Sequence, residues 1–279
     1  MFSDPLFQQT LVETVRSNPD LINPEGQPSL FDTISSQRNW TGLPVIFDEV
    51  FTGIYRLGHF NTSNLLGVSP DIIVNAKLLT GGLVPLCTTT ASQEIFEAFL
   101  SNQKTDALLH GHSYTAHVVG CNVAVDSLKR MEKMEGQGSW DTFRNDWAEG
   151  EPARNAVWSM WSRDFVIRAS NIEQVDYIVS MGSVLAISLK DAQGSGKSLR
   201  ATILMCVAHH VTGYNSIAAL GLHKALLRSD GHGWTIHSRV LGNILYLMAS
   251  LTTPKATIRS IEARLLEELE TRHNVYVPI

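Results

Sequence analysis

Short apolar runs and helical repeats alternate in the first half of the chain. Residues 5–17 repeat their apolar positions at helical spacing and predict an amphipathic helix. Residues 43–50 (LPVIFDEV) and 71–77 (DIIVNAK) are almost continuously apolar, which is the pattern of strands buried on both faces of an α/β sheet. The connection between these two runs is long enough for a parallel crossover. A third run, at 83–90 (LVPLCTTT), predicts a further strand.

Helical patterns follow these strands. Residues 93–100 are predicted to be helical, with Ser92 as the N-cap, and 113–135 reads as a long helix. Residues 136–152 interrupt this pattern with glycine, proline and scattered charges. We therefore expect a domain boundary there, with a second, smaller unit at 153–279.

The second half mixes strands and helices. Residues 175–190 are predicted to form a strand, 199–228 mostly helix, and 233–238 and 243–249 short strands. A final helix is expected after the Thr-Pro pair at 253–254, because threonine is a common N-cap and proline a common first helical residue. Strands with crossovers followed by a small mixed unit predict an α/β fold with a C-terminal lobe.

Composition narrows the function classes. The 279 residues carry a formal net charge of −5 and have a pI near 6.0, which argues against nucleic acid or an anionic membrane as the main partner. No apolar run reaches the roughly 18 residues of a membrane span, and the acidic N-terminal segment resembles neither a signal nor a transit peptide. The cysteines Cys87, Cys121 and Cys206 form no CxxC pair and read as reduced thiols of an intracellular protein.

Two charged residues end the first two predicted strands. Asp48 lies near the end of 43–50, and Lys77 closes 71–77. The carboxyl ends of parallel strands share one edge of the sheet, where ligands bind in open α/β folds. The pair could therefore face one ligand from two sides, or form a salt bridge, or be two solvated strand ends.

Four sequence motifs give a more specific indication. They are VIFDEVFTGIYRLG (45–58), AKLLTGG (76–82), LLHGHSYTAH (108–117) and RVLGNILYLM (239–248). Together they resemble the class III aminotransferases, which belong to the fold-type I superfamily of enzymes that use pyridoxal 5′-phosphate (PLP). The resemblance extends, with gaps, over nearly the whole chain.

This resemblance implies an architecture. Residues 1–135 would be the C-terminal part of the large PLP-binding domain, 136–152 a linker or insertion, and 153–279 a small α+β C-terminal domain. The extra material around Trp140–Asn171 and Asp191–Asn215 departs from the family pattern.

The resemblance also implies an activity. The motifs are most similar to the eukaryotic members of the family branch that acts in biotin biosynthesis. Enzymes of that branch transfer an amino group from S-adenosylmethionine to 8-amino-7-oxononanoate and yield 7,8-diaminononanoate. Members of that branch are homodimers with shared active sites. The eukaryotic form is fused to a dethiobiotin synthetase, and its compartment is the mitochondrion; without this likeness the expectation is the cytoplasm. Another amino donor, such as lysine, or another class III substrate stays open.

Site roles carry over at matching positions. Lys77 matches the lysine that forms a Schiff base with PLP and moves the proton during transfer. Asp48 matches the carboxylate that faces the pyridine nitrogen. Ser113 matches a hydroxyl that reaches the cofactor phosphate of the neighbouring subunit, the backbone of His112 matches a second contact there, and Gly111 matches a substrate contact.

Two further positions concern the substrate. Arg239 matches the arginine that binds the carboxylate of the keto acid, a task that suits its planar guanidinium. Tyr246 matches a position near the site, although a tyrosine on a strand can equally be a core residue. One departure is Val240, since proline commonly follows this arginine in the family.

The matched region is only part of a family member. Family members carry further chain ahead of it, which supplies a glycine-rich cup for the cofactor phosphate and an aromatic residue that stacks on the ring. The sequence therefore resembles a fragment, and a non-catalytic relative is the second hypothesis. In that case the sheet edge next to residues 43–50 would be unpaired and its apolar face exposed.

Two other motifs are weaker. AQGSGKS (192–198) resembles a phosphate-binding loop, but Asp191 occupies the position where that motif needs its first glycine, so a turn is the better interpretation. The histidines His110, His112 and His117 could suggest a metal site. No carboxylate or cysteine completes the set at a convincing spacing, so we expect no metal.

Overall fold

The computed structural model describes residues 5–18, 43–107, 111–148, 156–190, 216–229, 231 and 233–271. The chain divides into two compact units, one at positions 1–138 and 153–156 and the other at 139–152 and 157–279. The assignment of the two halves to a cofactor-binding and a small domain stays a prediction. In the described parts, no helix is both long and apolar enough to cross a membrane.

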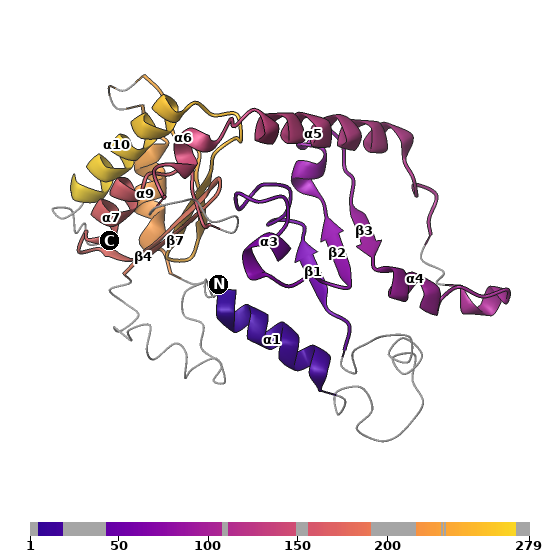
Figure 1. Ribbon diagram of the computed structural model, residues 1–279. Coiled ribbons are helices and arrows are strands. Elements are labelled where there is room, and N and C mark those ends of the chain that lie inside the picture. The colour runs from indigo at the N-terminus through magenta and orange to yellow at the C-terminus, as the bar shows by residue number, and fades with distance from the viewer. Residues whose placement is uncertain are drawn as a thin grey trace. The chain divides into compact units, whose positions relative to one another are not determined.

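The first unit contains short strands and mostly short helices (Figure 1). Its elements are α1 (Pro5–Ser17), β1 (Ile46–Glu49), α3 (Ser63–Leu66), β2 (Ile72–Asn75), the 3-10 turn η2 (Lys77–Leu79), β3 (Thr88–Ala91), α4 (Gln93–Ala98), η3 (Lys104–Asp106) and α5 (Val118–Gly136). The predicted first helix is confirmed. So is the cap of α4, where Ser92 Oγ accepts a hydrogen bond from the Ile95 amide.

Three strands form the sheet of this unit, in the order β1-β2-β3. β1 and β2 are parallel, as predicted, and β3 is antiparallel to β2. In Figure 1 the arrowheads of β1 and β2 point towards α5. The third strand starts later than predicted, at Thr88, because Leu83 is exposed and Pro85 has no amide hydrogen to donate to a strand ladder.

The prediction that 43–50 is buried on both faces was wrong. Ile46 is 59% exposed and Asp48 is also exposed, whereas Glu49 at the end of β1 is buried. Among the described residues, β1 has a hydrogen-bonded neighbour, β2, on one side only. An edge strand of a small sheet has less surface to cover its side chains.

Helix α5 packs against the turn that follows β2. The core here comprises the buried Ile54, Leu79 and Ala124, surrounded by Leu78, Leu86, Leu128 and Met131. Ser127 of α5 also donates a hydrogen bond of 3.1 Å to the Leu78 carbonyl. The long helix predicted from residue 113 begins at Val118, since the His117 Nδ1 caps it by accepting from the Gly120 amide.

The loop after β1 is held by a buried carboxylate. Glu49 is 2% exposed and accepts hydrogen bonds from the amide of Thr62, at 2.9 Å, and from its hydroxyl, at 2.7 Å. Two backbone bonds close the loop further, from Ile54 to Phe60 and from Tyr55 to His59. Burial raises the pKa of Glu49 above its ordinary value, although the Thr62 bonds oppose that rise.

This raised pKa predicts how Glu49→Gln changes the pH dependence of stability. A raised pKa means that the folded state favours the protonated carboxyl, so the wild type loses stability as pH rises through that value. The free energy of unfolding of the variant, relative to that of the wild type, should therefore increase as pH rises. Urea unfolding followed by circular dichroism, from about pH 4, near the ordinary value for glutamate, to about pH 8, measures this difference.

Glu132→Gln provides the control for this comparison. Glu132 is exposed on α5, so its variant should keep the same offset from the wild type at every pH. A Glu49→Gln offset that also stays constant across the range would contradict the prediction.

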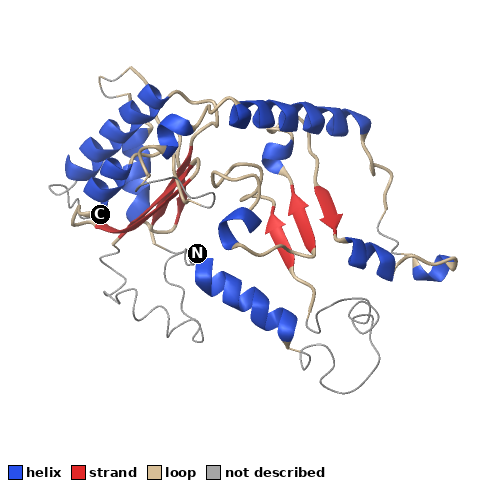
Figure 2. Ribbon diagram, viewed as in Figure 1, coloured by secondary structure: helices blue, strands red, loops and turns tan. Residues whose placement is uncertain are grey.

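The second unit is a four-stranded antiparallel sheet with helices. Its elements are α6 (Asp141–Arg144), α7 (Arg163–Ser170), β4 (Val175–Met181), β5 (Val184–Leu189), α9 (Ala218–Leu226), β6 (Arg239–Leu241), β7 (Ile244–Met248) and α10 (Lys255–Thr271). The strand order is β4-β5-β7-β6. Figure 2 shows α7, α9 and α10 on one face of this sheet.

Several predictions for this unit need correction. The single strand expected at 175–190 is a hairpin, whose turn includes Gly182 with a positive φ of 52°. The strand expected at 233–238 is absent, and β6 begins at Arg239 instead. The strand within 243–249 and the final helix are confirmed. Much of the helix expected at 199–228 lies outside the described residues, which include only α9 there.

A network of charges joins α10 to α7 and to the segment after α6. Glu262 of α10 is 4% exposed and accepts hydrogen bonds from the Ser162 amide, its hydroxyl and the Arg259 guanidinium, at 2.5, 2.9 and 2.6 Å. Ser162 in turn caps α7 by accepting from the Phe165 amide. Asp146 pairs with both Lys255 and Arg259. The Glu262 carboxylate therefore fixes the start of α7.

Replacing Glu262 should destabilise this unit strongly. Glu262→Ala leaves the part-buried amide and hydroxyl of Ser162 without their acceptor and takes one of two carboxylate partners from Arg259, and it should lower the free energy of unfolding by about 2–4 kcal/mol. Glu262→Gln keeps one acceptor oxygen and should cost about half as much. Urea unfolding followed by tryptophan fluorescence measures both variants.

The control is Glu270→Ala on the same helix. Glu270 forms an exposed ion pair with Arg168, which should contribute no more than about 1 kcal/mol. Equal losses for Glu262→Ala and Glu270→Ala would contradict the role given to the buried carboxylate.

Candidate active site

Strand register brings Asp48 and Lys77 to the same edge of the first sheet. Asp48 lies opposite Val74, and Glu49 lies opposite Asn75, the last residue of β2. Lys77 follows two residues later, at the start of the turn η2. A carboxylate and an amine are thus both positioned where the parallel strands end, the position at which open α/β sheets bind ligands.

The backbone of Lys77 is strained. Its φ of 48° lies in the left-handed region, which costs a residue with a side chain roughly 1–2 kcal/mol. Strain of this kind concentrates at functional sites and persists only where the neighbouring structure enforces it. Here the second and third residues after Lys77 anchor the turn, since Leu79 is in the core and the buried Thr80 donates a hydrogen bond of 2.6 Å to the Val84 carbonyl. The Lys77 side chain itself is exposed.

Asp48 and Glu49 are adjacent carboxylates in different environments. Glu49 is buried and engaged with Thr62, whereas Asp48 is exposed, and one of its oxygens accepts a 3.1 Å hydrogen bond from the Val50 amide. Successive residues of a strand point to opposite faces, so the burial of one and the exposure of the other follow from β1 geometry. Asp48 is therefore the carboxylate that a ligand can reach.

The chemistry of these two groups fits PLP. The cofactor has an aldehyde, which condenses with an amine, and a ring nitrogen, which pairs with a carboxylate. Lys77 would supply the amine and Asp48 the carboxylate, and both lie at one sheet edge. These two residues therefore match two groups of the cofactor, the aldehyde and the ring nitrogen.

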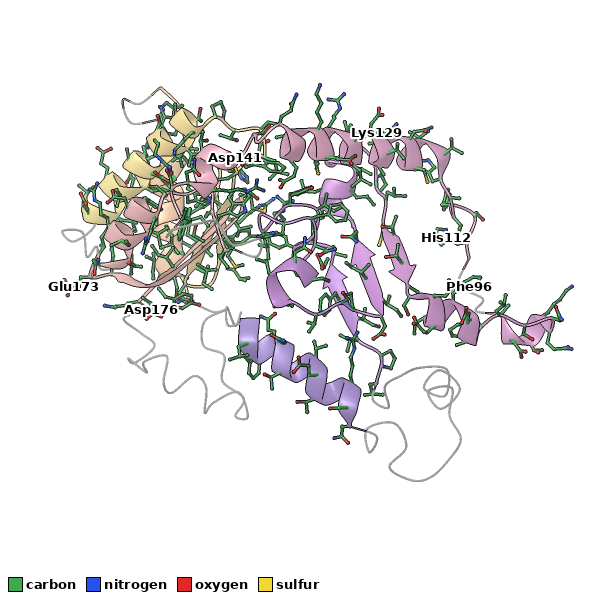
Figure 3. The ribbon with its side chains drawn as sticks, in the orientation of Figure 1. Phe96, His112, Lys129, Asp141, Glu173 and Asp176 are labelled. Atoms are coloured by element: carbon green, nitrogen blue, oxygen red, sulfur yellow. The ribbon has the colours of Figure 1, made fainter. Side chains whose placement is uncertain are left out.

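The segment between α4 and α5 carries the other predicted cofactor residues, His112 and Ser113, and the predicted substrate contact Gly111. Gly111, His112 and Ser113 are all exposed, and Figure 3 shows His112 on this connection. The His112 amide donates to the Thr115 hydroxyl at 2.9 Å, and the Tyr114 amide donates to the His112 ring at 3.1 Å. None of the interactions described for Ser113 or His112 joins them to the sheet edge. Their role towards the cofactor of a second subunit stays a prediction.

The weaker motifs fall largely outside the described residues. The segment 192–198 lies outside them, as does His110 of the three histidines. The described part of the chain holds no group of three or more His, Cys, Asp or Glu residues arranged to bind a metal ion. Within that part, His117 acts as a helix cap.

Two of the three predicted substrate residues, Arg239 and Tyr246, are neighbours in the second unit. Arg239 of β6 lies directly opposite Tyr246 of β7, so both side chains are on the same face of this sheet. Ile244 and Met248 are on that face too, two residues before and after Tyr246. The face thus combines one guanidinium with an aromatic ring and apolar side chains.

The chain leading into β6 is anchored at alternate residues. The Ile236 amide donates to the Leu226 carbonyl at 2.8 Å, and the Ser238 hydroxyl lies 2.9 Å from His223 Nδ1. Ile236 and Ser238 are buried, whereas the residue after each of them is exposed. This alternation directs the Arg239 side chain away from the helices and towards the open face.

One neighbour of Lys77 was missed by the sequence reasoning. The ring centroid of Phe51 lies 5.4 Å from the Lys77 amine and 5.4 Å from the guanidinium carbon of Arg56. Burial lowers the pKa of Arg56 from its ordinary value. The sequence alone offers no signal for this contact, because it appears only once β1 and β2 are paired in register. An aromatic residue after an apolar strand had simply read as more apolar sequence.

Known proteins match this chain over nearly its whole length. The family model described as Aminotransferase class-III matches residues 10–265. A bifunctional dethiobiotin synthetase/adenosylmethionine-8-amino-7-oxononanoate aminotransferase from Emericella nidulans is 52% identical over 276 residues, which cover 96% of this chain and 32% of that protein. A bifunctional dethiobiotin synthetase/7,8-diamino-pelargonic acid aminotransferase, mitochondrial, from rice is 37% identical over 250 residues, or 90% of this chain and 24% of that one.

A solved structure agrees with the fold. The adenosylmethionine-8-amino-7-oxononanoate aminotransferase of Methanocaldococcus jannaschii superposes with a TM-score of 0.62 at 23% identity, and the match covers 81% of this chain and 45% of that one. The chain spans about a third of the fungal relative and under half of the solved structure. The α/β class predicted from the sequence is confirmed. From the family match and the identity to the fungal relative, this chain belongs to the class III aminotransferases, PLP-dependent enzymes of fold-type I.

Proposed function

We propose that this chain takes part in PLP-dependent transfer of an amino group from S-adenosylmethionine to 8-amino-7-oxononanoate, which yields 7,8-diaminononanoate for biotin biosynthesis. The observation that carries the proposal is the convergence of Lys77 and Asp48 at one sheet edge. The substrates follow from the printed names of the fungal and rice relatives, which are 52% and 37% identical to this chain.

Each residue of this edge has a distinct task. Lys77 would hold the cofactor covalently, and its amine would carry a proton between two carbon atoms during transfer. Asp48 would accept a hydrogen bond from the ring nitrogen and keep that nitrogen protonated. Bound PLP supplies an electron-accepting ring that stabilises negative charge on the reacting carbon.

The open face of the second sheet suits an aliphatic acid. Arg239 would bind the substrate carboxylate, with Tyr246 beside it. Ile244 and Met248 would contact the hydrocarbon chain of 8-amino-7-oxononanoate. The substrate thus carries a carboxylate at the end of an apolar chain, and this face carries the Arg239 guanidinium beside apolar side chains.

The proposal includes an assembly. A homodimer would allow Ser113, with the His112 backbone, to reach the cofactor phosphate of the second copy, and Gly111 to contact substrate there. The fungal and rice relatives are named as fusions with a dethiobiotin synthetase, so we extend that association to this protein. The rice relative is named mitochondrial, which supports a mitochondrial location.

One observation favours a second candidate function. Among the described residues β1 is an edge strand with an exposed apolar residue, Ile46. An unpaired edge of this kind can accept another strand. A non-catalytic subunit that pairs with a longer aminotransferase fits that feature. Cofactor binding that requires addition of such a partner would favour this candidate.

Lys77→Ala should abolish cofactor attachment. The wild type mixed with PLP should develop the visible absorbance of a covalently bound cofactor, and the variant should show only free PLP. Absorbance spectra after gel filtration measure this, and circular dichroism checks the fold. Lys133→Ala, an exposed lysine on α5, should behave as the wild type. If Lys77→Ala retains the bound band, Lys77 is not the attachment point.

Arg239→Gln should weaken binding of the keto acid. Loss of a charged hydrogen-bonding partner should raise the KM for 8-amino-7-oxononanoate by about tenfold to a hundredfold. The half-reaction with S-adenosylmethionine should keep its rate, since that step does not use the keto acid. Steady-state and single-turnover kinetics separate the two effects. Equal losses in both half-reactions would assign Arg239 a general structural role instead.

A further inference from the structure

The ring of Phe51 lies beside the Lys77 amine because of strand register. Phe51 follows Glu49 by two residues, and Lys77 follows Asn75 by two residues, while Glu49 and Asn75 are paired. Both residues lie beyond the paired strands, Phe51 in the turn after β1 and Lys77 at the start of η2. The amine lies 5.4 Å from the ring centroid, within the range of a cation–π contact.

The loop that carries Phe51 packs closely against the end of β2. A Cβ added at Gly53 would lie 2.5 Å from Asn75 Oδ1 and 3.0 Å from the Glu49 carbonyl oxygen, so a larger residue here would force these neighbours to move. The Gly53 amide donates to that carbonyl at 3.1 Å, and the Glu49 carboxylate holds Thr62 at the far end of the loop. Phe51 is therefore part of a fixed surface.

Lys77, in contrast, has a long and exposed side chain. An exposed lysine on a flexible four-carbon stem samples many rotamers. Its strained backbone, with φ of 48°, sets only the direction in which the side chain leaves the turn. The Phe51 ring is the one contact described for the Lys77 amine, within the part of the chain that the structure covers.

We infer that Phe51 is a positioning residue for the reaction of Lys77. Its ring holds the Lys77 ammonium at the sheet edge in the resting protein. To attach PLP, the ammonium leaves the ring and gives a proton to solvent, the neutral amine adds to the cofactor aldehyde, and water departs as the covalent linkage forms. The inference rests on the proposed function, since it assigns Phe51 to the attachment of PLP. Phe51 acts through Lys77 and needs no contact with the substrate.

The first measurement tests the contact without cofactor. Lysine amines are methylated with a carbon-13 label, and the Lys77 resonance is identified by its loss in Lys77→Arg. Ring current from Phe51 should shift that resonance, and the shift should vanish in Phe51→Leu. Phe60→Leu is the matched control, since the Phe60 ring lies on the same loop but contacts Tyr55. A Lys77 resonance at the same position in wild type and Phe51→Leu overturns the inference.

The second measurement tests the consequence for cofactor attachment. The visible band should form about two- to fivefold faster in Phe51→Leu than in the wild type, because the variant lacks an exposed cation–π contact that favours the unreactive ammonium. Phe60→Leu should form it at the wild-type rate. Phenylalanine analogues with one, two and three ring fluorines at position 51 keep the shape of the ring while weakening its attraction for cations. The rate should therefore rise in steps along this series, whereas a purely structural role gives a flat series and overturns the inference.

The two proposals fail in different ways. A wild type that develops no visible band with PLP overturns the proposed function, and the role given to Phe51 falls with it. A band that forms equally fast in the wild type, in Phe51→Leu and across the fluorinated series overturns only the inference. If Phe51→Leu does not fold, the fluorinated series decides alone.

Discussion

The hydrogen-bonded register between β1 and β2 determines where the reactive groups of the first unit lie. It sets Asp48 opposite Val74 and Glu49 opposite Asn75, and the residues that follow leave the sheet at one edge. Phe51 follows Glu49 by two residues, and Lys77 follows Asn75 by two residues. A shift of one residue in this register would turn Asp48 inwards and Glu49 outwards, because successive side chains of a strand alternate between its faces. The candidate site thus depends on backbone pairing before it depends on any side chain.

Burial then gives neighbouring residues different tasks. Glu49 is desolvated and its pKa is raised, while it fixes the loop through Thr62. Asp48, one residue earlier, is exposed and can accept a ligand. The second unit repeats the principle at Arg239, since Ile236 and Ser238 anchor the chain on α9 and leave the guanidinium on the open face opposite Tyr246. In both units, buried anchors hold exposed chemistry in place.

Sequence reasoning predicted the elements whose signals are local. The parallel strands, the Ser92 cap, the final helix and the candidates Asp48 and Lys77 all follow from apolar runs, capping residues and strand ends. It failed where tertiary structure overrides local pattern. Residues 233–238 read as a strand from their alternation, yet their polar contacts go to helix α9 instead of to another strand.

The residues that position the site were harder to predict. Glu49 lies near the end of the predicted strand 43–50 and Phe51 just beyond it, and their roles appear only when two strands are paired in a known register. The positive φ of Lys77 has no signal in composition, since lysine rarely adopts it. The side chains predicted to act across two subunits, such as Ser113, lie on an exposed connection that local pattern cannot orient.

The most direct test of this account is to locate the cofactor on the chain. The protein is incubated with PLP, the linkage is reduced with borohydride, and the digested peptides are mapped by mass spectrometry. The account predicts that the cofactor mass is found on Lys77, with other exposed lysines such as Lys133 and Lys190 unmodified. A cofactor mass spread over the exposed lysines, or absent from Lys77, would contradict it.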